Sequence, residues 1–122
     1  MADAREMELM RQTVEIIRRI GEAAERLRGE EKTLPTLEKP GIAGLVAKFA
    51  EEGSFNIYTP TTDAWLNELV LVIGAFGYRI VSPGRNRTVD PLYRLTPPAA
   101  EADGLDIVWE NGAFVQGPKD FI

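Results

Sequence analysis

The sequence predicts an α+β fold, in which N-terminal helices precede a mainly antiparallel sheet. Residues 4–28 show helical periodicity without a proline, and residues 64–76 form a second, strongly apolar segment. The later residues alternate polar and apolar side chains between turn signals, which is typical of strands. Because helical and strand patterns occupy separate parts of the chain, the predicted class is α+β.

The first predicted helix carries an apolar seam that repeats every three or four residues. Its members are Met7, Met10, Val14, Ile17, Ile20, Ala24 and Leu27. A helix of about 25 residues is roughly 37 Å long, which exceeds the width of so small a domain. We therefore expect residues 1–30 to assemble the chain into a homodimer or a higher homo-oligomer. The alternative is that residues 40–76 of the same chain cover the seam.

Residues 31–122 are expected to form a compact α+β body. A charged connector with two prolines is followed by a short amphipathic helix over residues 41–52. Residues 62–76 predict the central apolar helix on which the sheet packs. A threonine caps this helix, and Asp63 lies in its first turn, where the helix dipole favours an acid.

The expected strands are short and cover residues 54–59, 78–81 and 92–95, followed by a hairpin over residues 106–116. The hairpin prediction rests on Asn-Gly at positions 111 and 112, because both central residues of such a turn take positive φ. A two-residue turn there pairs Trp109 with Phe114 and Val108 with Val115.

Composition excludes several classes of function. The chain has no cysteine and no histidine, which removes thiolate metal sites, cysteine nucleophiles and the usual general base. We therefore expect a protein that is not an enzyme and has no metal and no cofactor. A net charge of −5 disfavours nucleic acid as a partner. The longest apolar run, residues 69–76, is too short to span a membrane, and residues 1–6 do not resemble a signal peptide, so a cytoplasmic location is expected.

The loop over residues 82–91 is the best candidate for a binding site. Pro83 and Gly84 predict a turn, so Arg85 and Arg87 would project from a constrained loop. Arginine forks suit phosphate, and the neutral side chains of the loop suit a ribose or a base edge.

Aromatic residues flank this loop in the sequence, as a nucleotide site requires. The candidate ligand-binding residues are Phe76, Arg79, Arg85, Asn86, Arg87, Thr88, Tyr93 and Arg94, with Arg18, Arg19 and Arg26 of a neighbouring copy. The expected partner is a small phosphorylated nucleotide. The alternative is a solvated loop whose arginines pair with the acidic residues near the C-terminus.

The segment Tyr93-Arg94-Leu95-Thr96-Pro97, following Gly77-Tyr78-Arg79-Ile80-Val81, resembles the wing of winged-helix regulators. That resemblance implies a regulator that binds DNA or protein. It departs from the family in residues 64–76, which contain no basic residue, whereas a recognition helix has a basic face. A structural or adaptor subunit is a further alternative.

The long N-terminal helix, the small α+β body, the arginine-rich loop and the missing catalytic set together resemble the phage-encoded sponge proteins that counter Thoeris defence. This resemblance implies a homo-oligomer that sequesters cyclised ADP-ribose signals in the host cytoplasm without cleaving them. It also implies a pocket with an aromatic residue, an asparagine and arginines. The matching positions are Phe76, Asn86 and Arg85, Arg87 or Arg94.

Overall fold

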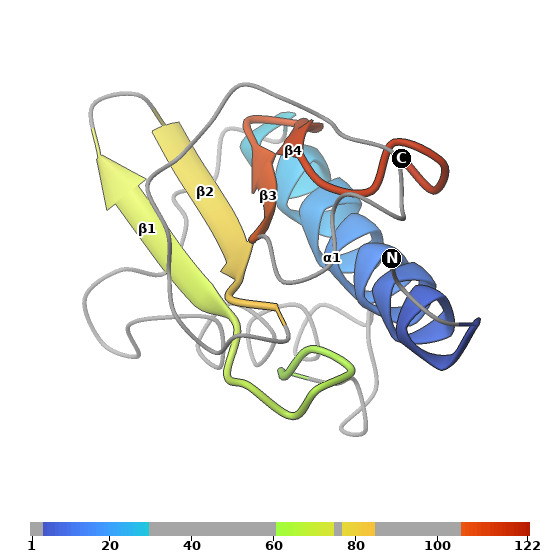
Figure 1. Cartoon of the computed structure of the whole chain (residues 1–122). Helices are drawn as coiled ribbons and strands as arrows, with labels where there is room; N and C mark the ends of the chain where they lie inside the picture. The colour runs from blue at the N-terminus through green and yellow to red at the C-terminus, as the bar shows by residue number, and fades with distance from the viewer. Residues whose placement is uncertain (1–3, 30–60, 75–76, 85–105) are drawn as a thin grey trace.

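One long helix lies against one antiparallel sheet in the computed structural model, which describes residues 4–29, 61–74, 77–84 and 106–122. The helix is α1 (Ala4–Gly29). The strands follow as β1 (Val70–Gly74), β2 (Gly77–Ser82), β3 (Ile107–Glu110) and β4 (Ala113–Gln116). They form a four-stranded sheet in the order β1-β2-β3-β4, with antiparallel neighbours throughout (Figure 1). The predicted α+β class is confirmed at this level.

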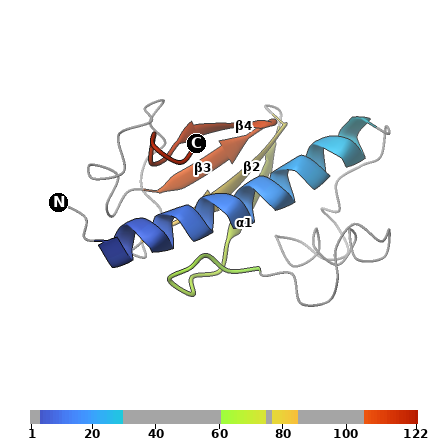
Figure 2. The same ribbon diagram turned by 90° about the vertical axis from the view of Figure 1, so that its right-hand side faces the viewer.

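Helix α1 forms where the sequence predicts it, and its apolar seam faces the sheet. The seam residues Val14, Ile17 and Ile20 are fully buried, and they belong to one core cluster with Ile80 and Trp109 of the sheet. Figure 2 shows α1 crossing the face of the sheet. The chain's own strands therefore cover this part of the seam, so its burial does not require a second copy of the chain.

Alternation along the strands decides which side chains meet the helix. One row across the sheet runs through the paired residues Leu71, Ile80, Trp109 and Phe114, and all four pack in the core cluster. The neighbouring row pairs Arg79 with Glu110, so these charged side chains point to the opposite face of the sheet.

The predicted central helix over residues 62–76 is wrong. Residues 63–66 form a turn, and residues 70–74 form β1, which pairs with β2 from Val70↔Val81 to Gly74↔Gly77. The run Leu69 to Ile73 is apolar on both faces, so its periodicity does not separate helix from strand. Three of the five residues Leu69–Ile73 are β-branched, and pairing with β2 satisfies their backbone groups. The sheet packs on helix α1 instead of on a central helix over residues 62–76.

The C-terminal hairpin is confirmed, with one difference in register. Asn111 and Gly112 have φ of 51° and 102°, as the predicted turn requires, and Trp109 pairs with Phe114. A bulge then places Gln116, not Val115, opposite Val108. The bulge turns Gln116 inward, where its buried amide donates to the Asp106 carbonyl at 3.0 Å.

The predicted helix over residues 41–52 and the predicted strands over residues 54–59 and 92–95 lie outside the described residues. The described strand over residues 77–82 matches the predicted strand over residues 78–81. No helix in the described ranges combines the length and the apolar character needed to cross a membrane.

Candidate functional site

The base of the arginine-rich loop is a buried turn at the end of β2. Ser82, Pro83 and Gly84 are all buried, and Gly84 has a φ of 72°, which favours glycine. The Gly84 amide donates to Ser82 Oγ at 3.2 Å, and the Gly84 carbonyl accepts from Asn67 Nδ2 at 2.9 Å. The chain therefore leaves the sheet from a point that hydrogen bonds hold on both sides.

The carboxylate of Asp63 organises this base. Its Oδ2 accepts from Ser82 Oγ at 2.7 Å and from Asn67 Nδ2 at 3.1 Å, while its Oδ1 accepts from the amides of Trp65 and Asn67 at 2.9 Å each. Asp63 is 2% exposed, so these donors replace the water that a carboxylate otherwise binds. The sequence interpretation placed Asp63 in a first helical turn and missed this role.

A further contact ties the same turn to α1. Thr13 lies in the middle of the helix with its side chain fully buried. Its Oγ1 donates to the Leu9 carbonyl at 2.9 Å and accepts from the Ala64 amide at 3.0 Å. Hydrogen bonds thus join residues 82–84, the Asp63 turn and the helix into one connected polar network.

Arg85 follows Gly84 directly in the sequence. The other loop candidates are Asn86, Arg87, Thr88, Tyr93 and Arg94, and like Arg85 they lie outside the described residues.

The strand β2 separates two groups of the predicted site residues. Phe76 precedes β2 and lies outside the described residues, whereas Arg85 follows the turn at its other end. A strand of this length, six residues, spans roughly 20 Å. Figure 1 shows the two ends of β2 at opposite ends of the sheet. The described residues therefore do not test whether the two positions contribute to one site.

Arg79 is engaged by the sheet itself. Its Nε and Nη2 donate to Glu110 Oε1 at 3.0 and 2.7 Å, and the two residues face each other in the β2–β3 register. The exposed fractions of the two side chains are 23% and 8%. Such a partly buried pair holds the guanidinium in place. The alternative interpretation, in which the arginines of the loop itself pair with C-terminal acids, concerns Arg85 and Arg87, which lie outside the described residues.

Arg18, a candidate for a neighbour's contribution, contacts the C-terminal segment of its own chain. Its Nη2 donates to the Phe121 carbonyl at 3.0 Å, its Nη1 bonds Glu15, and its guanidinium lies 5.5 Å from the centre of the Phe114 ring. Arg19 is exposed on α1. The backbone of Arg26 belongs to the last turns of the same helix.

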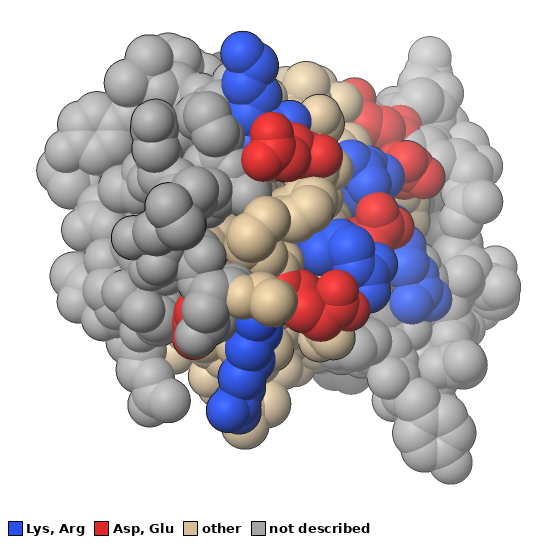
Figure 3. All heavy atoms as spheres, turned by 45° about the vertical axis from the view of Figure 1, so that its right-hand side comes forward, with Lys and Arg blue, Asp and Glu red and all other residues tan. Residues whose placement is uncertain are grey.

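Charges of both signs alternate over the face of the molecule in Figure 3, and the described residues there form no patch of a single sign. Glu8 and Arg11 form an exposed ion pair on α1. Hydrogen bonds from Arg11 and Gln12 lower the pKa of Glu8 from 4.5 to about 2. No group of three or more acidic side chains in the described ranges is arranged to hold a metal ion.

A second buried polar unit lies where the start of β2 and the β3–β4 turn meet the C-terminal half of α1. Trp109 Nε1 donates to the Tyr78 hydroxyl at 2.8 Å, and that hydroxyl donates to Glu25 Oε2 at 2.7 Å. The Asn111 side chain accepts from the Tyr78 amide at 3.0 Å. These contacts join residues about 30 to 60 positions apart, so no local pattern in the sequence predicts them.

Comparison with protein-family models, with curated proteins and with solved structures finds no match to this chain. The resemblance to winged-helix regulators required residues 64–76 as a helix. Residues 70–74 form a strand instead, antiparallel to β2, so the alternative of a DNA-reading protein loses the element that would enter the groove.

Proposed function

We propose that the chain is a non-catalytic binding protein that sequesters a small phosphorylated nucleotide, of the cyclic immune-signal type that phage sponge proteins take up. The loop that begins after Gly84 holds this ligand. Arg85 and Arg87 bind its phosphates, and Asn86 and Thr88 bind its ribose or the edge of its base.

One observation carries the proposal: the loop starts from the hydrogen-bonded unit of Asp63, Asn67 and Ser82. A loop that is fixed at its base loses less conformational entropy when it binds a ligand than a free basic segment does. The absence of cysteine and histidine from the sequence supports binding without cleavage.

The structure narrows the proposed ligand contacts. Arg79 donates to Glu110 and Arg18 donates to the Phe121 carbonyl, so we assign neither arginine to the ligand. An aromatic face for the base is assigned to Tyr93, which follows the loop in the sequence, because Phe76 precedes the opposite end of β2. The remaining cationic contacts in this proposal are Arg94 of the same chain and either Arg19 or Arg26 of a neighbouring copy.

Calorimetry over a panel of cyclic dinucleotides, cyclised ADP-ribose isomers, linear ADP-ribose and inorganic phosphate tests the proposal. Arg87→Ala is expected to weaken binding of the best ligand about tenfold or more, since a hydrogen bond to a charged group contributes about 1.5–3 kcal/mol. Arg11→Ala is the matched control, because Arg11 pairs with Glu8 on α1. Equal losses in both variants, or no binding in the panel, overturn the proposal.

Chromatography of the ligand after denaturation tests the second part. The ligand is expected to return unchanged in mass and retention time. A cleaved product would show that the chain is an enzyme.

A further inference from the structure

Leu66 is held in an unfavourable backbone conformation and exposes its side chain to solvent. Its φ is 66°, a left-handed value that L side chains other than Asn and Asp rarely adopt. Its exposed fraction is 82%, the largest among the described hydrophobic residues. The left-handed φ lowers the stability of a monomer, and the exposed side chain contributes no burial energy that would offset this strain. The folded chain alone therefore does not account for a leucine at this position.

The conformation is held by the turn around it. The Leu66 amide donates to the Asp63 carbonyl at 3.1 Å, and the amides on either side, of Trp65 and Asn67, donate to Asp63 Oδ1. These hydrogen bonds hold the backbone at the tip of the turn, so the position from which the Leu66 side chain projects is fixed. An apolar side chain on a fixed backbone loses less entropy when a partner covers it than one on a free segment does.

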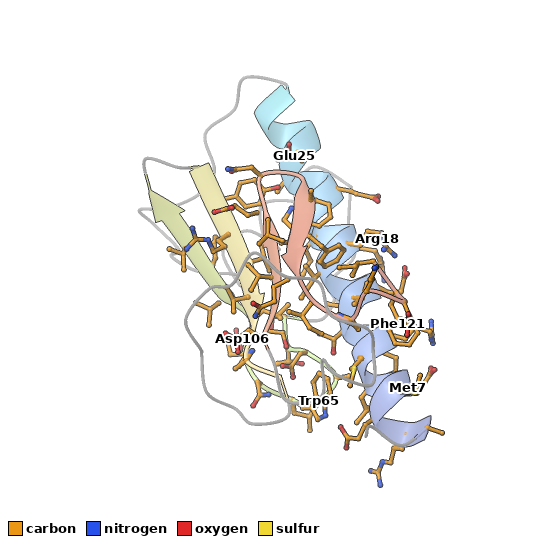
Figure 4. All side chains as sticks on the ribbon, turned by 45° about the horizontal axis from the view of Figure 1, so that its top comes forward. Met7, Arg18, Glu25, Trp65, Asp106 and Phe121 are labelled. Carbon is orange, nitrogen blue, oxygen red and sulfur yellow. The ribbon has the colours of Figure 1, made fainter. Side chains whose placement is uncertain are left out.

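A shallow apolar surface lies beside this tip, on the same end of the molecule. Met7, Trp65 and Phe121 are each partly buried and pack around the buried Met10 (Figure 4). The indole of Trp65 is fixed by a hydrogen bond of 3.0 Å from its Nε1 to Glu6 Oε2. Methionine and aromatic side chains of this kind form adaptable acceptors for an aliphatic residue.

Two charges of opposite sign border the tip and the apolar surface. Arg5 lies in the first turn of α1, next to the Glu6 that holds Trp65, and Glu68 follows the Leu66 turn. Both are exposed, and among the described residues neither side chain makes a hydrogen bond or an ion pair. The exposed Leu66, the partly buried apolar cluster and two opposite charges without a partner among the described residues are components of a self-complementary contact.

We propose that this surface binds a second copy of the chain. In the resulting two-fold dimer, Leu66 of each copy packs on Met7, Trp65 and Phe121 of the other, and Glu68 of each copy lies near Arg5 of the other. The contact is independent of the proposed ligand site. In this proposal the dimer forms through the Leu66 surface and not through the apolar seam of α1. Burial of the Leu66 side chain in the dimer interface compensates for the strain of its backbone conformation.

Sedimentation equilibrium of the full chain tests the proposal, with Leu66→Asn as the main variant. Asparagine accepts the left-handed conformation and is polar. This variant is expected to raise the dimer dissociation constant about tenfold or more, as the loss of an interface anchor does. Val72→Thr is the matched control, because Val72 is the other exposed large apolar residue, and it is expected to leave the dissociation constant unchanged.

A charge exchange tests the orientation of the two copies. Arg5→Glu and Glu68→Arg are each expected to weaken the dimer, and the double variant is expected to recover much of the loss. Dilution to a concentration at which the wild type is monomeric provides a further test. There, Leu66→Asn is expected to melt at the wild-type temperature or above, because the strain is relieved.

Four results overturn the proposal: a wild type that stays monomeric, a Leu66→Asn variant that dimerises as the wild type does, a Val72→Thr variant that loses the dimer equally, and a charge-exchanged variant without recovery. Recruitment of a different protein by a monomeric wild type would assign the surface to that partner and would also overturn the proposal.

Discussion

The indole of Trp109 lies directly over Gly21 in the middle of α1. A Cβ placed on Gly21 would come within 2.6 Å of Trp109 Cδ2, which is closer than real Cβ atoms come to other atoms. The helix therefore approaches β3 more closely at this residue than a side chain would allow.

Gly21→Ala is accordingly expected to destabilise the protein, although the same change in an exposed helix stabilises it by about 0.5–1 kcal/mol. Overpacking against Trp109 should lower the free energy of unfolding by about 1–3 kcal/mol, measured by urea denaturation. In the background of Trp109→Leu the penalty should shrink, because a smaller side chain leaves room. A Gly21→Ala variant as stable as the wild type would contradict the close approach.

The Tyr78 hydroxyl links the two layers, since it accepts from Trp109 and donates to Glu25. Tyr78→Phe removes the acceptor of a buried indole N–H and should cost about 1–3 kcal/mol of unfolding free energy. In Trp109→Phe the same substitution should cost less, because the indole donor is already gone. Additive losses in the double variant would show that the two groups are not coupled.

The Asp63 carboxylate fixes both the Leu66 turn and the base of the arginine-rich loop. Asp63→Ala removes an acceptor of four hydrogen bonds and should lower the free energy of unfolding by about 2–4 kcal/mol. Hydrogen exchange at the Trp65 and Asn67 amides should quicken before the sheet amides do. Ser82→Ala, which removes one of the four donors, should have a smaller effect of the same kind. Unchanged exchange at Trp65 and Asn67 in Asp63→Ala would contradict this role.

The pair Glu8–Arg11 makes stability depend on acid pH. The pKa of Glu8 is lowered from 4.5 to about 2 in the folded state, so its contribution is fully present above pH 4.5 and is lost as the pH falls toward 2. Glu8→Gln should therefore differ from the wild type at neutral pH and match it at pH 2. Because the pair is exposed, the difference should be small and should decrease in high salt. A Glu8 midpoint near 4.5 by NMR titration would contradict the pairing.

Local signals in the sequence predicted α1 and the C-terminal hairpin. Seam spacing defines the helix, and Asn111-Gly112 defines the turn, without help from distant residues. The segment around Val70 could not be assigned in this way, because an apolar, β-branched run satisfies both patterns until β2 pairs with it.

The strand that precedes the candidate site was predicted, whereas the ligand-binding role of the loop stays a prediction. The expected strand ends at residue 81, and β2 ends one residue later, at Ser82. The sequence could not assign Arg79, because the partner Glu110 lies 31 positions later and meets it only through the β2–β3 register. The function of the buried Asp63 likewise depends on Ser82, 19 positions away.

The contact between Arg18 and the Phe121 carbonyl has a consequence for the order in which the molecule folds. It spans 103 positions, and the strand that covers Gly21 also comes from the last part of the chain. During synthesis the seam of α1 therefore lacks the part of its native cover that β3 and β4 provide until the last residues have been made. Closing so long a loop slows folding, and the nascent chain exposes an amphipathic helix in the meantime. Chaperones that recognise such helices are expected to meet this chain early.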